Sequence, residues 1–272
     1  MQGSLGEKIG EGASADVHAW APGLVVKLFK TGIPRRASWW EARVTRAVFA
    51  AGGPAPEVVG EVTLEGRFGI VLPHLDGSPL RHLSETGAMT AGQVGLVLAT
   101  VALSVHKTPP PAGVFSLRDN MEGSLRLSAS MLPEPIAAGV LNLIDRLSPG
   151  DGLCHGDLHS GNVIMTAEGP RIVDWTGAVR APAGFDLACC HVLLTEIAPE
   201  LVDDPARPRA VGAAVQTEYA RLAGISPAAL TTAMEPYLPI VRVRVVLGGA
   251  APRMRERLIQ RVEAALSSED LI

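Results

Sequence analysis

Two carboxylates and one carboxamide near the middle of the chain have the types and spacing of a phosphate-handling site. Asp157 and Asn162 lie five residues apart in the segment HGDLHSGNVIM, residues 155–165, and Asp174 lies in the later segment IVDW. Carboxylate and amide oxygens suit Mg²⁺, and a carboxylate can orient a hydroxyl and accept its proton. Because this spacing is typical of ATP-dependent phosphoryl transfer, we predict Asp157 as the catalytic base, and Asn162 and Asp174 as metal ligands.

Two short apolar runs are expected to bring these groups together. Residues 163–165 form one run, residues 171–173 form the other, and the turn-prone Glu-Gly-Pro at 168–170 separates them. This pattern predicts a β-hairpin, which would return Asp174 to the neighbourhood of Asn162. The alternative is a polar surface loop whose spacing arose by chance.

The segments HGDLHSGN and IVDW together resemble the motifs of the aminoglycoside phosphotransferase and choline kinase group of protein-kinase-like enzymes. In those families the Asp-Phe-Gly of protein kinases commonly reads as Asp followed by an aromatic or other residue, and Asp174-Trp175-Thr176 occupies that place here. The resemblance implies an α+β, two-lobed protein-kinase-like fold, with a small antiparallel-sheet N-lobe containing one helix and a larger, mainly helical C-lobe. It also implies ATP and Mg²⁺ as cofactors and a small-molecule hydroxyl acceptor, aminoglycoside-like or an amino alcohol.

The N-terminal third contains the phosphate-binding features that such an enzyme needs. Gly10 and Gly12 would let phosphates approach the backbone closely, although Ala15 stands at the third position of the G-x-G-x-x-G pattern. Lys27 is the one charged residue of the apolar run 24–29. Because a buried, unpaired charge is costly, Lys27 is expected to have an anionic partner. The alternative is an edge-strand lysine that reaches solvent.

A helix is predicted over residues 38–51, with Ser38 as its N-cap. Its apolar residues recur at helical spacing and are Trp40, Val44, Ala47, Val48 and Ala51. Glu41 is its only acidic residue. The order of loop, lysine and glutamate favours an ion pair between Lys27 and Glu41, which would hold the lysine on the nucleotide phosphates. The alternative is that Glu41 is there only because an acidic side chain in the first turn interacts favourably with the helix dipole.

Two further short runs, residues 58–64 and 68–72, flank the turn-like Glu-Gly-Arg at 65–67 and should complete the antiparallel sheet. By similarity to aminoglycoside kinases, the Pro73 carbonyl and the Leu75 amide are expected to bind adenine. A proline is compatible with this role because only its carbonyl would be used. The resemblance thus implies an N-terminal nucleotide-binding lobe at 1–72, a hinge at 73–78 and a helical C-terminal lobe with the acceptor cleft at 79–272.

Beyond the hinge the sequence predicts helices. Residues 94–105 are apolar almost all round, which indicates a buried helix too short to span a bilayer, and residues 253–266 form an amphipathic helix. The segment 109–135 is expected to be a loop or a short helix. The resemblance gives structural roles to Asp186, which would brace the catalytic loop, and to His155, which would pack behind the metal aspartate.

Composition narrows the class of protein further. The chain has 272 residues, is 47% hydrophobic and carries a net charge of −4, with no long basic block, so we expect no nucleic-acid partner. The first residues, MQGSLGEKIG, lack a secretory pattern, so a cytoplasmic location and no membrane association are expected. The cysteines, Cys154, Cys189 and Cys190, are interpreted as buried thiols without disulfides or zinc. The oligomeric state stays open.

Function also leaves alternatives. A non-catalytic kinase-like nucleotide-binding protein would keep the same motifs, and a protein Ser/Thr kinase would need an activation loop and an A-P-E-like segment, which are hard to find after Asp174. The acceptor is not identified. The acidic residues Glu196, Glu200, Asp203 and Asp204 either receive a polyamine sugar or form a solvated helix end. With 4% aromatic residues, a cage for a quaternary ammonium group is difficult to assemble.

Overall fold

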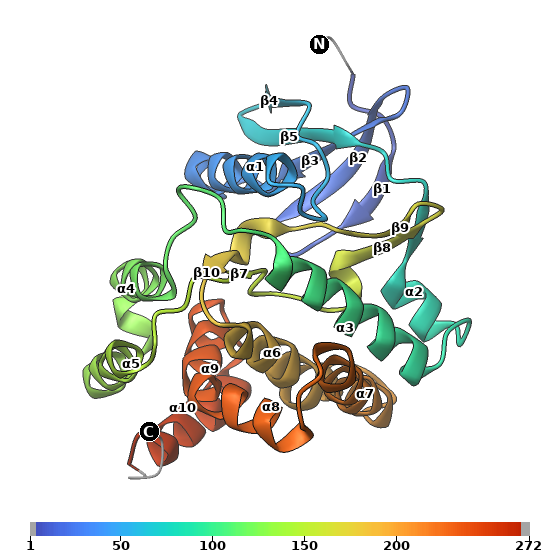
Figure 1. Ribbon diagram of the computed structural model, residues 1–272. Coiled ribbons are helices and arrows are strands. Elements are labelled where there is room, and N and C mark those ends of the chain that lie inside the picture. Colours follow the sequence, from blue (N-terminus) through green and yellow to red (C-terminus); the bar gives the residue numbers. More distant parts are fainter. Residues whose placement is uncertain (1–3, 268–272) are drawn as a thin grey trace.

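The computed structural model describes residues 4–267; residues 1–3, part of the segment considered above for a secretory signal, and 268–272 lie outside it. The N-terminal part is a five-stranded antiparallel sheet in the order β1-β2-β3-β5-β4, with one helix against it (Figure 1). Its elements are β1 (Lys8–Glu11), β2 (Ala15–Ala21), β3 (Leu24–Phe29), α1 (Arg35–Ala50), β4 (Gly60–Leu64) and β5 (Arg67–Pro73).

The central strand β3 is covered on both faces. On one face Phe29 belongs to a small apolar cluster with Ala42 of α1, and on the other Val26 packs with Trp20. A strand buried on both faces reads as a nearly continuous apolar run, which explains the sequence of β3. The edge-strand alternative for Lys27 is wrong, because β3 pairs with β2 on one side and with β5 on the other.

Helix α1 begins earlier than predicted. Its N-cap is Pro34, and Ser38 lies inside the helix, where its hydroxyl donates to the carbonyl of Arg35. The predicted Ser38 cap is therefore wrong. The earlier start also places Glu41 in the second turn, and the first turn contains no acidic residue. The dipole explanation for Glu41 therefore fails, because that effect is confined to the first turn.

Two hairpins match the predicted turns. Between β4 and β5, Glu65 and Gly66 have φ values of 48° and 76°, the left-handed conformations of a two-residue type I′ turn. Strands β8 (Val163–Thr166) and β9 (Gly169–Ile172) form the hairpin expected before Asp174. Gly169 and Pro170 belong to β9 and not to the turn, so the turn is tighter than predicted.

The rest of the chain is mainly helical and lies below the sheet in Figure 1. It contains two small sheets of its own: β6 (Gly77–Pro79) pairs with β8 of the β8–β9 hairpin, and β7 (Leu153–Cys154) pairs with β10 (Val179–Arg180). Its helices are α2 (Leu80–Glu85), α3 (Ala91–Lys107), α4 (Leu117–Leu127), α5 (Glu134–Arg146), α6 (Ala183–Val192), α7 (Ala206–Ala223), α8 (Pro227–Met234), α9 (Leu238–Leu247) and α10 (Pro252–Ser267).

These helices enclose one large apolar cluster. The predicted buried helix is α3, which begins at a capping box formed by Thr90 and Gln93. The predicted amphipathic helix is α10, which buries Leu258 and Val262. The segment 109–135 contains α4 and a 3-10 turn, so its short-helix interpretation is confirmed. All three cysteines are buried and free of disulfide bonds.

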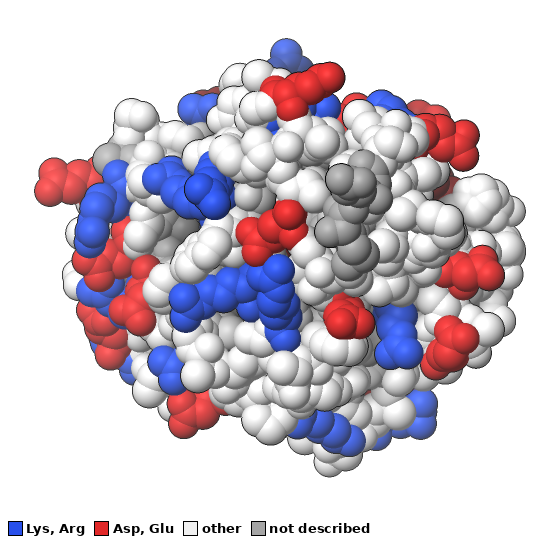
Figure 2. Space-filling model, turned by 90° about the horizontal axis from the view of Figure 1, so that it is seen from above, with Lys and Arg blue, Asp and Glu red and all other residues white. Residues whose placement is uncertain are grey.

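Two surface properties bear on possible partners. Within residues 4–267, every helix is too short or too polar to cross a membrane. Seen from above, basic and acidic side chains alternate over the visible face in small groups (Figure 2).

Candidate active site

Lys27 lies between two carboxylates from distant parts of the chain. Its Nζ donates to both carboxylate oxygens of Glu41 on α1, at 2.8 and 2.9 Å, and lies 3.2 Å from Oδ2 of Asp174. The Lys27 and Glu41 side chains are only 13% and 4% exposed, whereas that of Asp174 is 31% exposed. The predicted Lys27–Glu41 ion pair is present, and Asp174 extends it into a three-residue cluster.

Mutual attraction and burial shift the three pKa values. Burial opposes the charge on Lys27, but the two carboxylates outweigh it and raise the pKa of Lys27. Burial also raises the pKa of Glu41 to about 7, against the opposing effect of Lys27. At Asp174, burial acts upward, yet Lys27 and the Thr176 hydroxyl hold its pKa below the ordinary value. The most exposed carboxylate is therefore the one that stays ionised over the widest pH range.

The backbone at Asp174 has a left-handed conformation, with φ 62° and ψ 66°. Such a conformation is uncommon outside glycine and costs about 1–3 kcal/mol, and Asp and Asn tolerate it best. The Thr176 hydroxyl donates to Oδ1 of Asp174, and Lys27 approaches Oδ2, so both oxygens gain a partner in this turn. The strained residue is thus one that the sequence singled out for chemistry.

The hairpin places the second metal candidate beside the first. Val163 of β8 pairs with Ile172 of β9, and the amide of Val173 then donates to the carbonyl of Asn162 at 2.9 Å. The Asn162 side-chain amide donates to the backbone carbonyl of Asp157 at 2.9 Å and to its Oδ2 at 3.2 Å. Asn162 is buried, whereas the Asp157 side chain is 44% exposed. The five-residue spacing therefore forms a closed loop with its carboxylate accessible.

Asp186 of α6 holds this loop from behind. Its carboxylate accepts the backbone amides of His155 at 3.0 Å and Gly156 at 2.7 Å, and it also lies 3.2 Å from Nε2 of His106. Burial raises the pKa of Asp186, but His106 and the His155 amide outweigh burial and lower it overall. The geometry agrees with the bracing role expected for Asp186.

His155 has a structural position. Its ring is buried against Trp175, its Nε2 lies 3.2 Å from the carbonyl of Val173, and its Nδ1 accepts the amide of Asp157. Burial lowers the pKa of His155, so the ring is neutral near pH 7. With both ring nitrogens engaged, His155 is not free to act as a base. His159 accepts the amide of Gly161, and its Nε2 lies 3.7 Å from Asp157.

Three sets of contacts could not be read from the sequence. His106, in the last turn of α3, is hydrogen-bonded as a structural histidine, and it joins Asp186 to the hydroxyl of Tyr219 at 2.7 Å. Trp40, interpreted only as part of an apolar stripe, donates its indole N–H to the carbonyl of Thr176 at 3.2 Å. Arg244 of α9 donates to the carbonyl of Gly177 at 3.2 Å. These contacts join segments far apart in sequence, and no local pattern signals them.

The predicted phosphate loop and hinge lie at the sheet. Gly10 of β1 is opposite Val17 of β2, which is opposite Lys27, so Gly10 is two strand spacings, roughly 10 Å, from the lysine backbone. Gly12 follows in the β1–β2 turn, where its amide donates to Ala15. Pro73 ends β5, and Leu75 lies two residues further on, before β6.

The predicted acidic cluster does not form an open anionic surface. The Glu196 side chain is 8% exposed and accepts two hydrogen bonds from Arg242, and Arg261 lies 2.8 Å away. Glu200 pairs with Arg257. Burial raises the pKa of Glu196, but the arginines overcome this and lower it. Glu200, Asp203 and Asp204 remain exposed, as the solvated helix end requires, so it is only for Glu196 that neither interpretation holds.

The expectation concerning an A-P-E-like segment is also corrected. Residues 198–200 read Ala-Pro-Glu and form a 3-10 turn. What precedes them differs from an activation loop, because Asp174 is followed by a 3-10 turn (Trp175–Gly177), β10, α6 and a π-helical turn (Leu193–Ile197). Regular structure occupies most of the chain between Asp174 and this tripeptide.

A family model described as the phosphotransferase enzyme family matches residues 6–230. A comparison with curated protein sequences finds no significant match.

Several solved structures share the fold. An aminoglycoside-3′-phosphotransferase of type VIII has a TM-score of 0.58 at 20% identity, covering 87% of this chain and 94% of its own. A choline kinase from Cryptosporidium parvum Iowa II has a TM-score of 0.58 at 14% identity, covering 97% and 89%. APH(2″)-IIa, in a ternary complex with streptomycin and ATP, has a TM-score of 0.55 at 16% identity, covering 96% and 91%.

At these identities the neighbours establish the fold alone, which is the predicted two-lobed kinase-like fold with an antiparallel sheet and a mainly helical remainder. The match to the family model extends over both parts, from before β1 into α8. It therefore includes the sheet with Lys27, the loop with Asp157 and the hairpin before Asp174. The chain belongs to the phosphotransferase enzyme family.

Proposed function

We propose that the protein transfers the γ-phosphoryl group of ATP to a hydroxyl of a small molecule. The observation that carries this proposal is the position of Lys27, whose ammonium lies between Glu41 and Asp174. In kinases a strand lysine paired with a helix glutamate neutralises nucleotide phosphates, and an aspartate beside them binds metal. The cluster has the charges and the partial exposure that this task requires.

ATP binding would use the sheet edge and the segment after β5. Gly10 and Gly12 lack positive φ, and a Cβ at Gly10 would meet Val17 only at an ordinary 3.5 Å. Because the fold itself tolerates a larger residue at Gly10, close approach of phosphates is a reason for glycine there. The amide of Leu75 has no hydrogen-bond partner among residues 4–267, so it is free to bind adenine together with the Pro73 carbonyl.

The residues also fit a magnesium ion. Asn162 directs its amide N–H toward Asp157, which leaves its side-chain oxygen without a partner in the described part of the chain, and Asp174 contributes a partly exposed carboxylate. Oxygen donors of this kind suit Mg²⁺. When bound, Mg²⁺ would neutralise charge on the phosphates. In this orientation the Asn162 side chain would offer its oxygen to the metal while its N–H group stays bonded to Asp157.

Asp157 would act on the acceptor. Its side chain is accessible, and its Oδ2 accepts one hydrogen bond from Asn162, which leaves the other oxygen to receive an acceptor hydroxyl. Because the transition state of phosphoryl transfer is loose, the main task of Asp157 is to orient this hydroxyl and accept its proton late. We assign residues 1–72 to the nucleotide lobe, 73–78 to the hinge and 79–272 to the lobe containing the acceptor cleft.

A screen of hydroxyl-bearing acceptors would test the proposal. Amino sugars, amino alcohols, nucleosides and macrolides are incubated with Mg-ATP, and acceptor-dependent ATP consumption is measured, with the phosphorylated product identified by mass spectrometry. For the best acceptor, Asp157→Asn should reduce the transfer rate on the order of 10²- to 10⁴-fold and leave Mg-ATP binding in calorimetry nearly unchanged. Asp145→Asn, an exposed carboxylate of α5, is the matched control.

Three outcomes would contradict parts of the proposal. Equal turnover in parent and Asp157→Asn would remove the catalytic role of Asp157. Nucleotide binding without phosphorylation of any acceptor would favour the non-catalytic nucleotide-binding protein. Phosphorylation of peptides in preference to small molecules would favour the protein kinase.

A further inference from the structure

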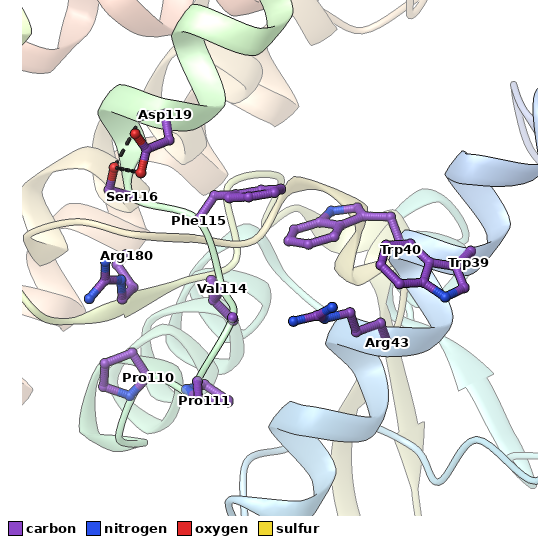
Figure 3. A pocket seen from close by; sticks show the side chains of 12 residues that line it. Trp39, Trp40, Arg43, Pro110, Pro111, Val114, Phe115, Ser116, Asp119 and Arg180 are labelled. Atoms are coloured by element: carbon purple, nitrogen blue, oxygen red, sulfur yellow. Dashed lines mark hydrogen bonds between the residues drawn. The ribbon is translucent and has the colours of Figure 1, made fainter.

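A cavity of about 440 Å³ lies outside the cluster of Lys27, Glu41 and Asp174. Helix α1 forms one wall with Trp39, Trp40 and Arg43, and the chain before α4 forms the other (Figure 3). Arg180 of β10 lies beyond Val114, next to Ser116 (Figure 3). None of the residues proposed to bind nucleotide or metal lines this cavity.

The cavity contains two cations without a carboxylate partner. Within residues 4–267, neither Arg43 nor Arg180 forms a salt bridge, and Nε of Arg180 is buried with no hydrogen-bond partner. The one carboxylate of the lining, Asp119, accepts the hydroxyl of Ser116 at 2.7 Å. A buried, unsatisfied guanidinium nitrogen is costly, and an anionic ligand would relieve that cost.

Aromatic rings supply the apolar part of the walls. Trp40 stacks on Phe115 with centroids 4.6 Å apart and an interplanar angle of 17°. Arg43 lies over the ring of Trp39 at 5.3 Å. Trp39 and Phe115 are each 49% exposed, so both rings have apolar surface available to a ligand. Flat rings and guanidinium planes together suit a planar ligand.

The walls are held by contacts that do not involve a ligand. Gly113 has φ +85°, a conformation that favours glycine, and the guanidinium of Arg43 lies directly against it. The amide of Arg180 donates to the carbonyl of Phe115 at 2.8 Å. The Trp40 indole is bonded to Thr176, two residues after Asp174. The cavity is therefore a preformed pocket rather than a gap between loose segments.

We infer that this pocket is a second ligand site, separate from the nucleotide site, that binds a small planar aromatic carboxylate or similar aromatic anion. The guanidinium groups of Arg43 and Arg180 (Figure 3) supply the positive charge that attracts the anionic group, and the rings of Trp39 and Phe115 contact the aromatic body. Because α1 also carries Glu41, the ligand lies against the helix that positions Lys27.

Binding of 2-naphthoate to the full chain would test this inference. Calorimetry and tryptophan fluorescence should show saturable binding with a dissociation constant below about 1 mM. 2-Naphthalenemethanol, which has the same rings without charge, and cyclohexanecarboxylate, which has the charge without the aromatic ring, should each bind at least about tenfold more weakly. Equal binding of either analogue would overturn the inference.

Variants locate the site. The double variant R43Q/R180Q should weaken 2-naphthoate binding by at least about tenfold, whereas Arg126→Gln, on the exposed face of α4, should leave it unchanged. Should the double variant fail to fold, Arg43→Gln alone, which alters an exposed side chain without hydrogen bonds among the described residues, should still weaken binding several-fold. Unchanged affinity in both variants, or displacement of 2-naphthoate by a non-hydrolysable ATP analogue with Mg²⁺, would overturn the assignment.

Discussion

The sheet region and the helical region hold their charged groups in different ways. In the sheet region, Lys27 is held by two side-chain carboxylates, one on α1 and one that follows β9. In the helical region, the loop 155–162 is held mainly through its backbone, because Asp186 accepts two successive amides and Val173 donates to the carbonyl of Asn162. The two arrangements differ in the pH at which they lose charge: burial raises the pKa of Glu41 to about 7, whereas the pKa of Asp186 is lowered, so Asp186 stays ionised to lower pH.

The apolar cores differ in the same direction. Two small clusters support the sheet, whereas one continuous cluster extends through the helices and includes Val44 and Val48 of α1. Local stability tends to follow the amount of buried apolar contact. We therefore expect the helical region, which contains the loop 155–162, to be locally more stable than the sheet region, which contains Lys27. Asp174 contacts Lys27 and follows the hairpin that adjoins this loop.

The largest expected effect tests Asp174, which the two regions share. Asp174→Asn removes the charge but keeps a residue that tolerates the left-handed backbone, so the fold should survive while turnover falls on the order of 10³-fold. Asn162→Ala should reduce turnover roughly tenfold. In magnesium titrations, both variants should need a higher Mg²⁺ concentration for half-maximal activity than the parent does. The control Asp145→Asn should match the parent. Parent-like magnesium dependence in both variants would remove the metal assignment.

The next effect tests the helical region through Asp186. Asp186→Asn places an N–H group against backbone amides, so unfolding free energy in urea should fall by about 3 kcal/mol. Because the pKa of Asp186 is lower in the folded state, its stabilisation is present above the unfolded-state pKa and is lost as pH falls through the folded-state pKa. The variant should lack this acid-dependent loss. A change below about 1 kcal/mol would show that the loop does not depend on Asp186.

A smaller effect tests the sheet region through Lys27 and Glu41. Lys27→Ala should raise the Mg-ATP concentration for half-maximal activity by roughly tenfold or more and change stability by less than about 1 kcal/mol, because the buried Glu41 can take up a proton near neutral pH. Glu41→Gln should have a similar but weaker effect, and the double variant should resemble Lys27→Ala. Arg46→Gln, which alters an exposed ion pair on the same helix, is the control. Additive effects would show that the two residues act independently.

The smallest effect is the pH dependence of the ion pair. Since burial raises the pKa of Glu41 to about 7, this carboxylate gains a proton as pH falls from 8 to 6, and its attraction for Lys27 weakens. The Mg-ATP concentration for half-maximal activity should therefore rise several-fold, up to about tenfold, over this interval. For the same reason, ionising Glu41 costs stability as pH rises from about 4.5 to 7. Glu41→Gln should show a flat profile, and an equally steep profile in that variant would assign the titration to another group.

Local patterns in the sequence were sufficient where neighbours along the chain determine the structure. The alternation of apolar and turn residues predicted the β8–β9 hairpin and the β4–β5 turn, and the apolar run around Lys27 predicted a buried strand with a paired charge. Each depends on burial of a few consecutive side chains or on turn conformations that specific residues favour. Errors arose at boundaries, as at Ser38, where a good capping residue lies inside α1 because Pro34 starts the helix four residues earlier.

Long-range contacts decided what the sequence could not. Glu196 and Glu200 read as available acids, but arginines from α9 and α10 neutralise them once the helices pack. Trp40 read as a core residue, yet it bonds to Thr176 and forms a wall of a cavity with Phe115.

The sequence by itself determined the chemistry that is available: a carboxylate and an amide at loop spacing, a lysine in an apolar strand and a carboxylate after a hairpin. Only the tertiary structure decided which charges meet. It set Lys27 between Glu41 and Asp174, placed Asp186 behind the loop 155–162 and left Arg43 and Arg180 without carboxylate partners in the described residues. The physical reason is that residue types and local periodicity are properties of short segments, whereas pairing, burial and the resulting pKa shifts depend on elements brought together from distant parts of the chain.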